Sequence, residues 1–106
     1  MKSLFSLLGL ARRAGKLTSG ITNCLHALAH KEARLIILAE DAGRNREKVI
    51  KACLTEQVPY LEFGSRQEFL KYLGQSSCIW AVLCENFAQQ ILKYGNGILK
   101  KKQDLN

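Results

Sequence analysis

Residues 35–39 read Leu-Ile-Ile-Leu-Ala, an unbroken apolar run that indicates a buried strand. A strand without polar side chains on either face has to be covered on both faces, as the central strands of α/β sheets are. A second run of this kind, CIWAVLC over residues 78–84, predicts another central strand. The layers that cover both strands must come from the rest of the chain.

Apolar residues at helical spacing surround these strands. They predict helices over residues 2–14 and 21–29, a third capped by Asn45, a fourth from the Ser65–Glu68 capping box to Gly74, and a last one capped by Asn86. Residues 17–19 predict a short strand, and Pro59 opens an edge strand because proline cannot donate to a ladder. The alternation predicts helices on both faces of a central sheet, an α/β sandwich.

Some details of burial and helix ends also follow from the pattern. Leu54 and Leu70 are expected to face inward with the apolar stripes of their helices. Gly15 is expected to end the first helix. From Gly95 onward, glycine and lysine predict fraying and a flexible basic tail over residues 100–106.

Length and charge describe one globular domain, residues 1–99, with an uneven charge distribution. The 106 residues are 47% hydrophobic and 24% charged, and the net charge is +7. Residues 1–34 hold six lysines and arginines against one acidic residue, whereas residues 35–99 hold seven of each sign. Positive charge gathered in the N-terminal third and the tail predicts a surface for a polyanion.

Four cysteines, Cys24, Cys53, Cys78 and Cys84, form no C-x-x-C pair and are interpreted as small buried apolar residues. That usage fits a reducing cytoplasm. The N-terminal apolar run is too short for a signal peptide, and no stretch is long enough to span a bilayer. We therefore expect no membrane partner.

A cationic junction between the first two helices is the strongest functional signal. The stretch GLARRAGKLTSG, residues 9–20, carries Arg12, Arg13 and Lys16. Such side chains neutralise phosphates. Gly20 removes a side chain at the start of the second helix, where free backbone N–H groups favour anions. The stretch predicts a nucleic-acid contact, with RNA favoured over DNA.

The polar face of the second helix follows directly. Thr22, Asn23 and His26 are predicted to read base edges by hydrogen bonding or stacking. His26 also lies four residues before His30, but no third ligand is near in sequence, so neither a metal nor a cofactor is expected.

Two other classes of function stay open. A protein-interaction module would use the same basic surface on an acidic partner. A small α/β enzyme would act at Glu40 and Asp41, which follow a strand where such enzymes often keep catalytic acids. An acidic pair before a helix also serves as cap and dipole complement.

Four stretches together resemble a known family. They are LGLARRAGKLTSG (8–20), LIILAED (35–41), VPYLEFGSRQEFLKYLG (58–74) and CIWAVLCENFA (78–88). In order and spacing they are similar to the bacterial YlxQ-type branch of the kink-turn-binding ribosomal proteins, relatives of large-subunit proteins seven-Ae and thirty-e. The resemblance implies a three-layer α-β-α sandwich around a small mixed sheet of about four strands, and a ribosome-associated protein that is monomeric without RNA.

The resemblance also implies where RNA binds. Gly20, Thr22, Asn23 and His26 correspond to the positions that meet guanine edges, with Lys16 on phosphate. Further contacts would come from Glu40 and Asp41, and from the loop Gln75, Ser76, Ser77 and Cys78.

This chain departs from the family's pattern at three of these places. Strong kink-turn binders carry Asn-Glu at the positions of Thr22 and Asn23, Lys at that of His26, and a small apolar loop where Gln75–Ser77 is polar. Each weakened base contact would cost about 1–3 kcal/mol of discrimination. RNA binding is expected to tolerate these changes better than kink-turn selectivity does.

Overall fold

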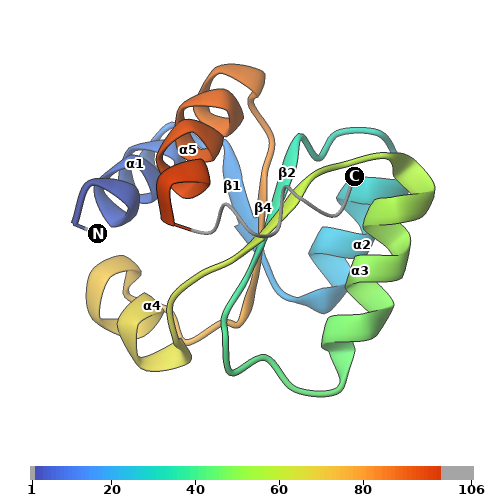
Figure 1. Cartoon of the computed structure of the whole chain (residues 1–106), viewed down its shortest axis with the longest axis horizontal. Helices are drawn as coiled ribbons and strands as arrows, with labels where there is room; N and C mark the ends of the chain where they lie inside the picture. Colours follow the sequence, from blue (N-terminus) through green and yellow to red (C-terminus); the bar gives the residue numbers. More distant parts are fainter. Residues whose placement is uncertain (1, 99–106) are drawn as a thin grey trace.

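The computed structural model describes residues 2–98, and the predicted tail over residues 100–106 lies outside them. Helices and strands alternate along the chain (Figure 1). They are α1 (Lys2–Arg13), β1 (Leu17–Ser19), α2 (Ile21–Ala29), β2 (Leu35–Leu38), α3 (Asn45–Glu56), β3 (Tyr60–Glu62), α4 (Arg66–Leu73), β4 (Ile79–Val82) and α5 (Glu85–Ile98).

Four strands form one mixed sheet in the order β1-β4-β2-β3. β4 runs antiparallel to both of its neighbours, so that Val82 lies opposite Leu17 on one side and Leu35 on the other. β2 and β3 are parallel. The two unbroken apolar runs contain the two central strands, β2 and β4, which are buried throughout. The strand that follows Pro59 is an edge strand, as predicted.

Helices cover both faces of this sheet. α1, α4 and α5 lie on one face, and α2 and α3 lie on the other (Figure 1). Successive side chains of β2 divide between the two cores because a strand has a period of two: Leu35 and Ile37 join one core, and Ile36 and Leu38 the other. The predicted three-layer α-β-α sandwich is confirmed.

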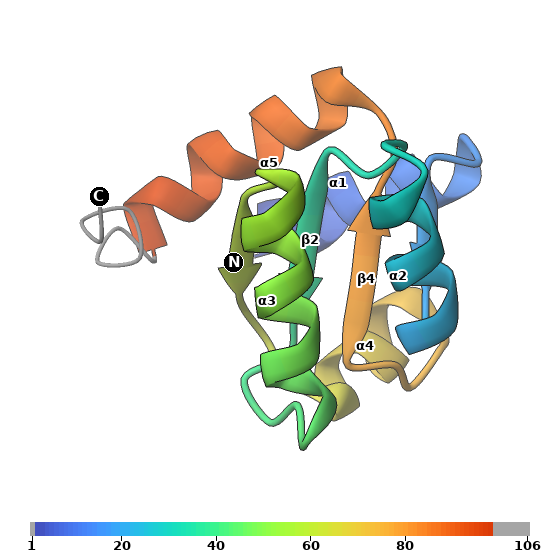
Figure 2. The ribbon, with the colours of Figure 1, turned by 90° about the vertical axis from the view of Figure 1, so that its right-hand side faces the viewer.

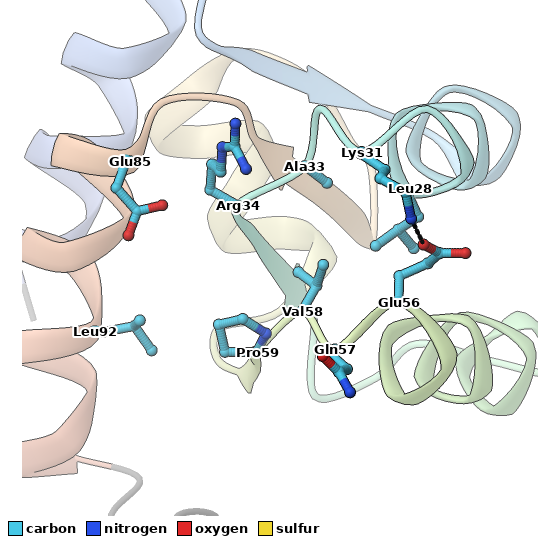
Figure 3. Close-up of a pocket in the computed structure, with 10 residues that line it drawn as sticks. All are labelled: Leu28, Lys31, Ala33, Arg34, Glu56, Gln57, Val58, Pro59, Glu85 and Leu92. Atoms are coloured by element: carbon cyan, nitrogen blue, oxygen red, sulfur yellow. Dashed lines mark hydrogen bonds and ion pairs between the residues drawn. The ribbon is translucent and has the colours of Figure 1, made fainter.

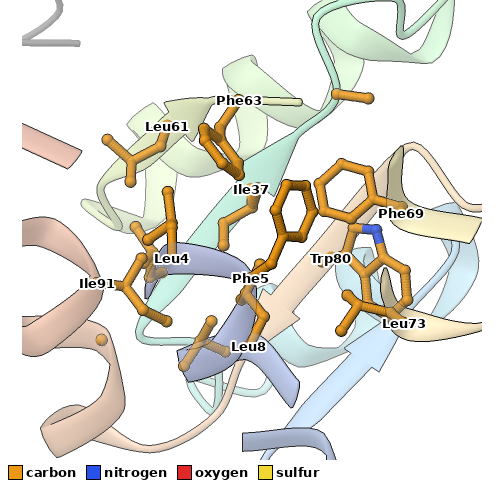
Figure 4. Close-up of a cluster of buried hydrophobic side chains, with 14 residues drawn as sticks. Leu4, Phe5, Leu8, Ile37, Leu61, Phe63, Phe69, Leu73, Trp80 and Ile91 are labelled. Carbon is orange, nitrogen blue, oxygen red and sulfur yellow. The ribbon is translucent and has the colours of Figure 1, made fainter. Parts of the chain in front are cut away.

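Aromatic side chains fill the core beneath α1 and α4 (Figure 4). The ring centroid of Phe5 lies 5.0 Å from that of Phe63 and 5.4 Å from that of Phe69. Trp80 of β4 continues the cluster, 5.5 Å from Phe69 and only 1% exposed. These contacts fix α4 on the sheet, and thereby the loop that follows it.

The ends of α4 are those expected. Ser65 Oγ accepts a hydrogen bond from the Glu68 backbone N–H at 3.2 Å, and the Glu68 carboxylate accepts one from the Ser65 N–H at 3.0 Å. Gly74 takes a φ of 77° and ends the helix in the left-handed region, as Gly15 does after α1 with a φ of 73°.

Two other predicted caps are wrong. Asn45 is the first residue of α3, and no side chain caps that helix. α5 begins at Glu85, so Asn86 lies inside its first turn. Because asparagine is tolerated both at a cap and just inside a helix, its presence does not fix the boundary. α5 also continues past Gly95 to Ile98, since a glycine costs a helix only about 1 kcal/mol relative to alanine.

Burial differs from expectation at four positions. Leu54 and Leu70 are 69% and 51% exposed rather than inward, because the buried stripes of their helices are narrower than the apolar pattern. Cys78 and Cys84 lie just beyond the ends of β4 and are only half-buried.

Cys24 and Cys53 are buried beneath α2 and α3, as predicted. Burial disfavours the charged thiolate and raises the pKa of each thiol to about 12. Within residues 2–98, no helix has the length and apolar character that crossing a membrane requires.

Candidate nucleic-acid interface

Four segments of the chain meet at one edge of the sheet, at the bottom of Figure 1. They are the junction before α2, the loop between α4 and β4, and the starts of α3 and α4. A pocket of about 220 Å³ lies between them and is lined by Gly20, Ile21, Asn45, Arg66, Ser76, Ser77, Cys78 and Ile79. We call this side of the molecule the Gly20 edge.

The first residues of three helices line this pocket. Ile21 begins α2, Asn45 begins α3 and Arg66 begins α4. The first N–H groups of a helix have no partner within the helix, and the helix dipole adds partial positive charge there. No side chain caps α2 or α3. The Gly20 edge therefore offers backbone N–H groups suited to an anion.

Gly20 joins β1 to α2 in a conformation that favours glycine. Its φ is 93°, its N–H donates to the Ile79 carbonyl at 3.0 Å, and its carbonyl accepts the Cys24 N–H at 2.9 Å. A Cβ built on Gly20 would meet no atom within 4 Å. The glycine is thus required by the backbone rather than by packing, and it leaves open space in front of α2.

The predicted reading face of α2 is exposed beside this space. Thr22, Asn23 and His26 all lie at the surface. Asn23 Nδ2 donates to the Ser19 carbonyl at 3.0 Å, which fixes the amide. The ring of His26 lies against that of His30, with centroids 4.0 Å apart. No group of three or more metal-ligating side chains gathers anywhere in residues 2–98.

Gln75 links three elements at this edge. Its Nε2 donates to Ser19 Oγ at 2.8 Å, and its Oε1 accepts from Arg12 Nη2 at 3.4 Å. The contacts join the end of α1, the end of β1 and the loop after α4. Arg12 is thereby held beside the residues that lead into Gly20.

Hydrogen bonds with β4 fix the rest of the loop between α4 and β4. The Trp80 indole Nε1–H donates to the Ser77 carbonyl at 3.0 Å, and Ser77 Oγ donates to the Ile79 carbonyl at 3.2 Å. Ser76 is exposed next to them. The loop therefore presents polar groups at the pocket from a fixed position.

Glu40 and Asp41 have structural roles at the same edge. The Glu40 N–H donates to the Gly64 carbonyl at 2.7 Å, and an Asp41 carboxylate oxygen accepts the Arg66 N–H at 3.1 Å. The acidic pair was expected to complement the next helix along the chain, α3, yet Asp41 caps the start of α4. The reason is that β3 returns parallel to β2 and brings α4 to this edge.

Lys16 and Arg13 are not part of this cluster. The Lys16 carbonyl accepts the Leu83 N–H, whereas Gly20 pairs with Ile79 at the other end of β4. Lys16 and Gly20 therefore stand at opposite ends of β1, about 13 Å apart along an extended chain. Arg13 is exposed at the end of α1.

Sequence reasoning missed Asn45 and Arg66. Both line the pocket although they are 21 positions apart in the sequence. The capping box correctly marks Arg66 as the first residue of its helix. Only the order of the strands shows that this helix starts beside α2 and α3.

A second pocket, of about 360 Å³, lies at the opposite edge (Figure 3). Its charged side chains are Lys31, Arg34, Glu56 and Glu85, and Lys31 Nζ forms an ion pair with Glu56 at 3.0 Å. Two cations thus face two anions, which gives a polyanion no net attraction. The Gly20 edge is the better candidate for a nucleic-acid contact.

Comparison with curated proteins finds two bacterial relatives. The chain is 34% identical over 90 residues to "RNA-binding protein YlxQ" of Bacillus subtilis (strain 168). The aligned residues cover 83% of this chain and 90% of that protein. The chain is 29% identical over 86 residues to "RNA-binding protein YlxQ" of Enterococcus faecium, with 80% and 84% covered.

Solved structures share the fold. A protein of unknown function from Bacillus halodurans C superposes with a TM-score of 0.81 at 29% identity, covering 85% of this chain and 93% of that one. The Giardia lamblia 15.5kD RNA binding protein superposes with a TM-score of 0.72 at 18% identity, covering 91% and 87%. Residues 2–92 match the model of the ribosomal protein L7Ae/L30e/S12e/Gadd45 family. The chain therefore belongs to the ribosomal protein L7Ae/L30e/S12e/Gadd45 family.

Proposed function

We propose that residues 1–99 form a single RNA-binding domain that recognises a structured, kink-turn-like RNA at the Gly20 edge. The observation that carries the proposal is the convergence of three helix starts, a glycine junction and a polar loop around one pocket. Family membership and relatives named as RNA-binding proteins support RNA as the partner.

In the proposed mechanism, one set of groups binds the RNA backbone and another recognises the bases. Backbone N–H groups at the uncapped starts of α2 and α3 bind phosphate oxygens, and Arg12 and Arg66 neutralise phosphate charge. Together these contacts set the orientation of the RNA. Thr22, Asn23 and His26 read the edges of bases that a bend turns toward α2. Because the starts of α2, α3 and α4 all line this one pocket, a bent backbone reaches more of them than a straight duplex does.

The protein is not an enzyme, since it belongs to a ribosomal protein family and its relatives are named RNA-binding proteins. The Asp41 carboxylate is already engaged at the start of α4. Ribosome association, a cytoplasmic location and a monomeric state without RNA complete the proposal.

Electrophoretic mobility shifts test the selectivity. A kink-turn RNA and a sequence-matched straight duplex are titrated at two salt concentrations. We expect tighter binding of the kinked RNA at both, because shape recognition survives when phosphate contacts are screened. Equal affinities at each salt contradict the selectivity, and binding of an acidic protein but of neither RNA supports the interaction-module alternative.

A pair of matched variants locates the contact. Thr22→Val removes an exposed hydroxyl from the proposed reading face, and Thr55→Val makes the same change on α3, away from that face. We expect Thr22→Val to reduce the preference for the kinked RNA and Thr55→Val to leave it unchanged. The reverse result would show that Thr22 is not part of the surface that recognises the bases.

A further inference from the structure

A groove runs between α2 and α3 on the outer face of the sandwich, the face that Figure 2 shows. Its volume is about 410 Å³, and its walls are Leu25, Leu28 and Ala29 of α2 and Lys48, Lys51, Ala52, Thr55 and Glu56 of α3. The middle of the groove is thus aliphatic. Small side chains, Ala29 and Ala52, keep it open.

The rim of the groove carries an excess of positive charge. Lys48 and Lys51 are exposed along the α3 side, and Glu56 at the far end is neutralised by its ion pair with Lys31. A segment that fits the groove has to place apolar side chains on Leu25 and Ala52 and carboxylates beside the two lysines. An acidic amphipathic helix has both properties.

Other occupants fit less well. RNA would meet the lysines with phosphates but would leave the aliphatic centre without an apolar partner. A second copy of the chain would put the same positively charged rim on both sides of the contact, because a two-fold interface joins the same patch of each subunit. The chain's own C-terminal residues carry Lys100, Lys101 and Lys102, which repel the rim.

We propose that the α2–α3 groove is a docking site for an acidic amphipathic helix of a protein partner. The groove shares no lining residue with the pocket of the Gly20 edge, although both use α2: the pocket is lined by Ile21, at the start of the helix, and the groove by Leu25, Leu28 and Ala29. A partner seated there would lie next to RNA held at the Gly20 edge, so that one domain joins the two.

Two synthetic peptides test the proposal with the full chain labelled with ¹⁵N. One is a helical peptide with leucines along one face and glutamates on the others; the second has the same composition with the leucines scattered. We expect only the striped peptide to shift the amide resonances of Leu25, Ala29, Ala52 and Thr55. Equal shifts from both peptides, or shifts that avoid these residues, overturn the proposal.

Charge variants provide the matched control. Lys48→Glu with Lys51→Glu reverses the rim, and Lys71→Glu with Lys93→Glu makes the same charge change on α4 and α5, on the other face of the sheet. We expect the first pair to weaken binding of the striped peptide about tenfold and the second to change it less than twofold. Equal losses from both pairs would mean that net charge, not the groove, binds the peptide.

A kink-turn RNA and a dilution series separate the remaining occupants. RNA is expected to shift residues of the Gly20 edge without displacing the peptide, and the groove resonances are expected not to change with protein concentration. Displacement of the peptide by RNA assigns the groove to RNA, and concentration-dependent groove shifts assign it to a second copy. Failure of the RNA to bind contradicts the proposed function while leaving the peptide result intact.

Discussion

Two glycines, Gly20 and Gly9, show whether backbone conformation or packing requires a glycine at a position. Gly9 in α1 and Gly20 before α2 both have room for a Cβ, since no atom lies within 4 Å of the position it would take. They differ in φ, which is 93° at Gly20, whereas Gly9 lies within a helix. Substitutions at Gly9 and Gly20 therefore report on backbone conformation alone, since packing is the same at both.

Opposite effects on stability are expected from alanine at these two positions. Gly20→Ala should lower the free energy of unfolding by about 1–2 kcal/mol, because an L-residue pays for a left-handed φ. Gly9→Ala should raise it by up to about 1 kcal/mol, the helix propensity of alanine over glycine. Urea unfolding of both variants measures the difference; a shift of the same sign in both would show that φ is not what matters.

The salt dependence of RNA affinity reports on individual cations. Arg66→Ala removes a charge at the pocket, and Lys16→Ala removes one at the other end of β1. If one RNA backbone spans this distance, each change should reduce the slope of log affinity against log salt by about one unit. Lys93→Ala, an exposed lysine on α5, serves as the control and should leave the slope unaltered. A slope that Lys16→Ala does not alter would confine the RNA to the pocket.

Buried thiols make stability sensitive to alkaline pH. The pKa of Cys24 and of Cys53 is raised from 9.0 to about 12 in the folded chain. Between these values the folded chain binds more protons than the unfolded chain, so the free energy of unfolding falls as pH rises. The slope is up to about 1.4 kcal/mol per pH unit for each thiol. Urea unfolding from pH 7.5 to 10.5 should show this fall, and Cys24→Ala should make it shallower. The proposed cause is absent if Cys84→Ala, at a half-buried position, has the same effect.

At the scale of elements, α4 depends on two caps of different origin. Ser65 is adjacent in sequence, and Asp41 reaches the Arg66 N–H from the segment after β2. Ser65→Ala and Asp41→Ala should each cost about 1 kcal/mol. Asp41→Ala should also disturb the Gly20 edge, because it frees the start of α4 that lines the pocket. Equal RNA affinity for wild type and Asp41→Ala, under conditions where both are folded, would show that the start of α4 does not contribute to RNA recognition.

Local sequence predicts an element well when several local signals agree. The Ser65–Glu68 box, an apolar stripe and Gly74 together mark both ends of α4 correctly. Asn45 is the only such signal near the start of α3, and a single asparagine does not distinguish a cap from the first residue of a helix. Leu54 fits the apolar pattern of α3 but is exposed, because only the packing of α3 on the sheet decides which flank is covered.

At the scale of the whole molecule, the layers followed from the sequence and the site followed only in part. Two wholly apolar strands require helices on both faces, so the sandwich is predictable from residues 35–39 and 78–84 alone. The strand order is not predictable in this way, and it decides which loops share an edge. It places Ser76 and Arg66 beside Gly20 and leaves Lys16 at the far end of β1.

The shared orientation of α2 and α3 affects how the molecule meets a partner in solution. Both helices begin at the Gly20 edge, and their last turns lie at the pocket of Lys31 and Glu56. Their peptide dipoles add, so the field of an approaching polyanion exerts a torque that turns the Gly20 edge toward it before any contact is made. Collisions would then be productive more often than random tumbling allows, and the association rate constant should fall more steeply with ionic strength than the dissociation rate constant changes.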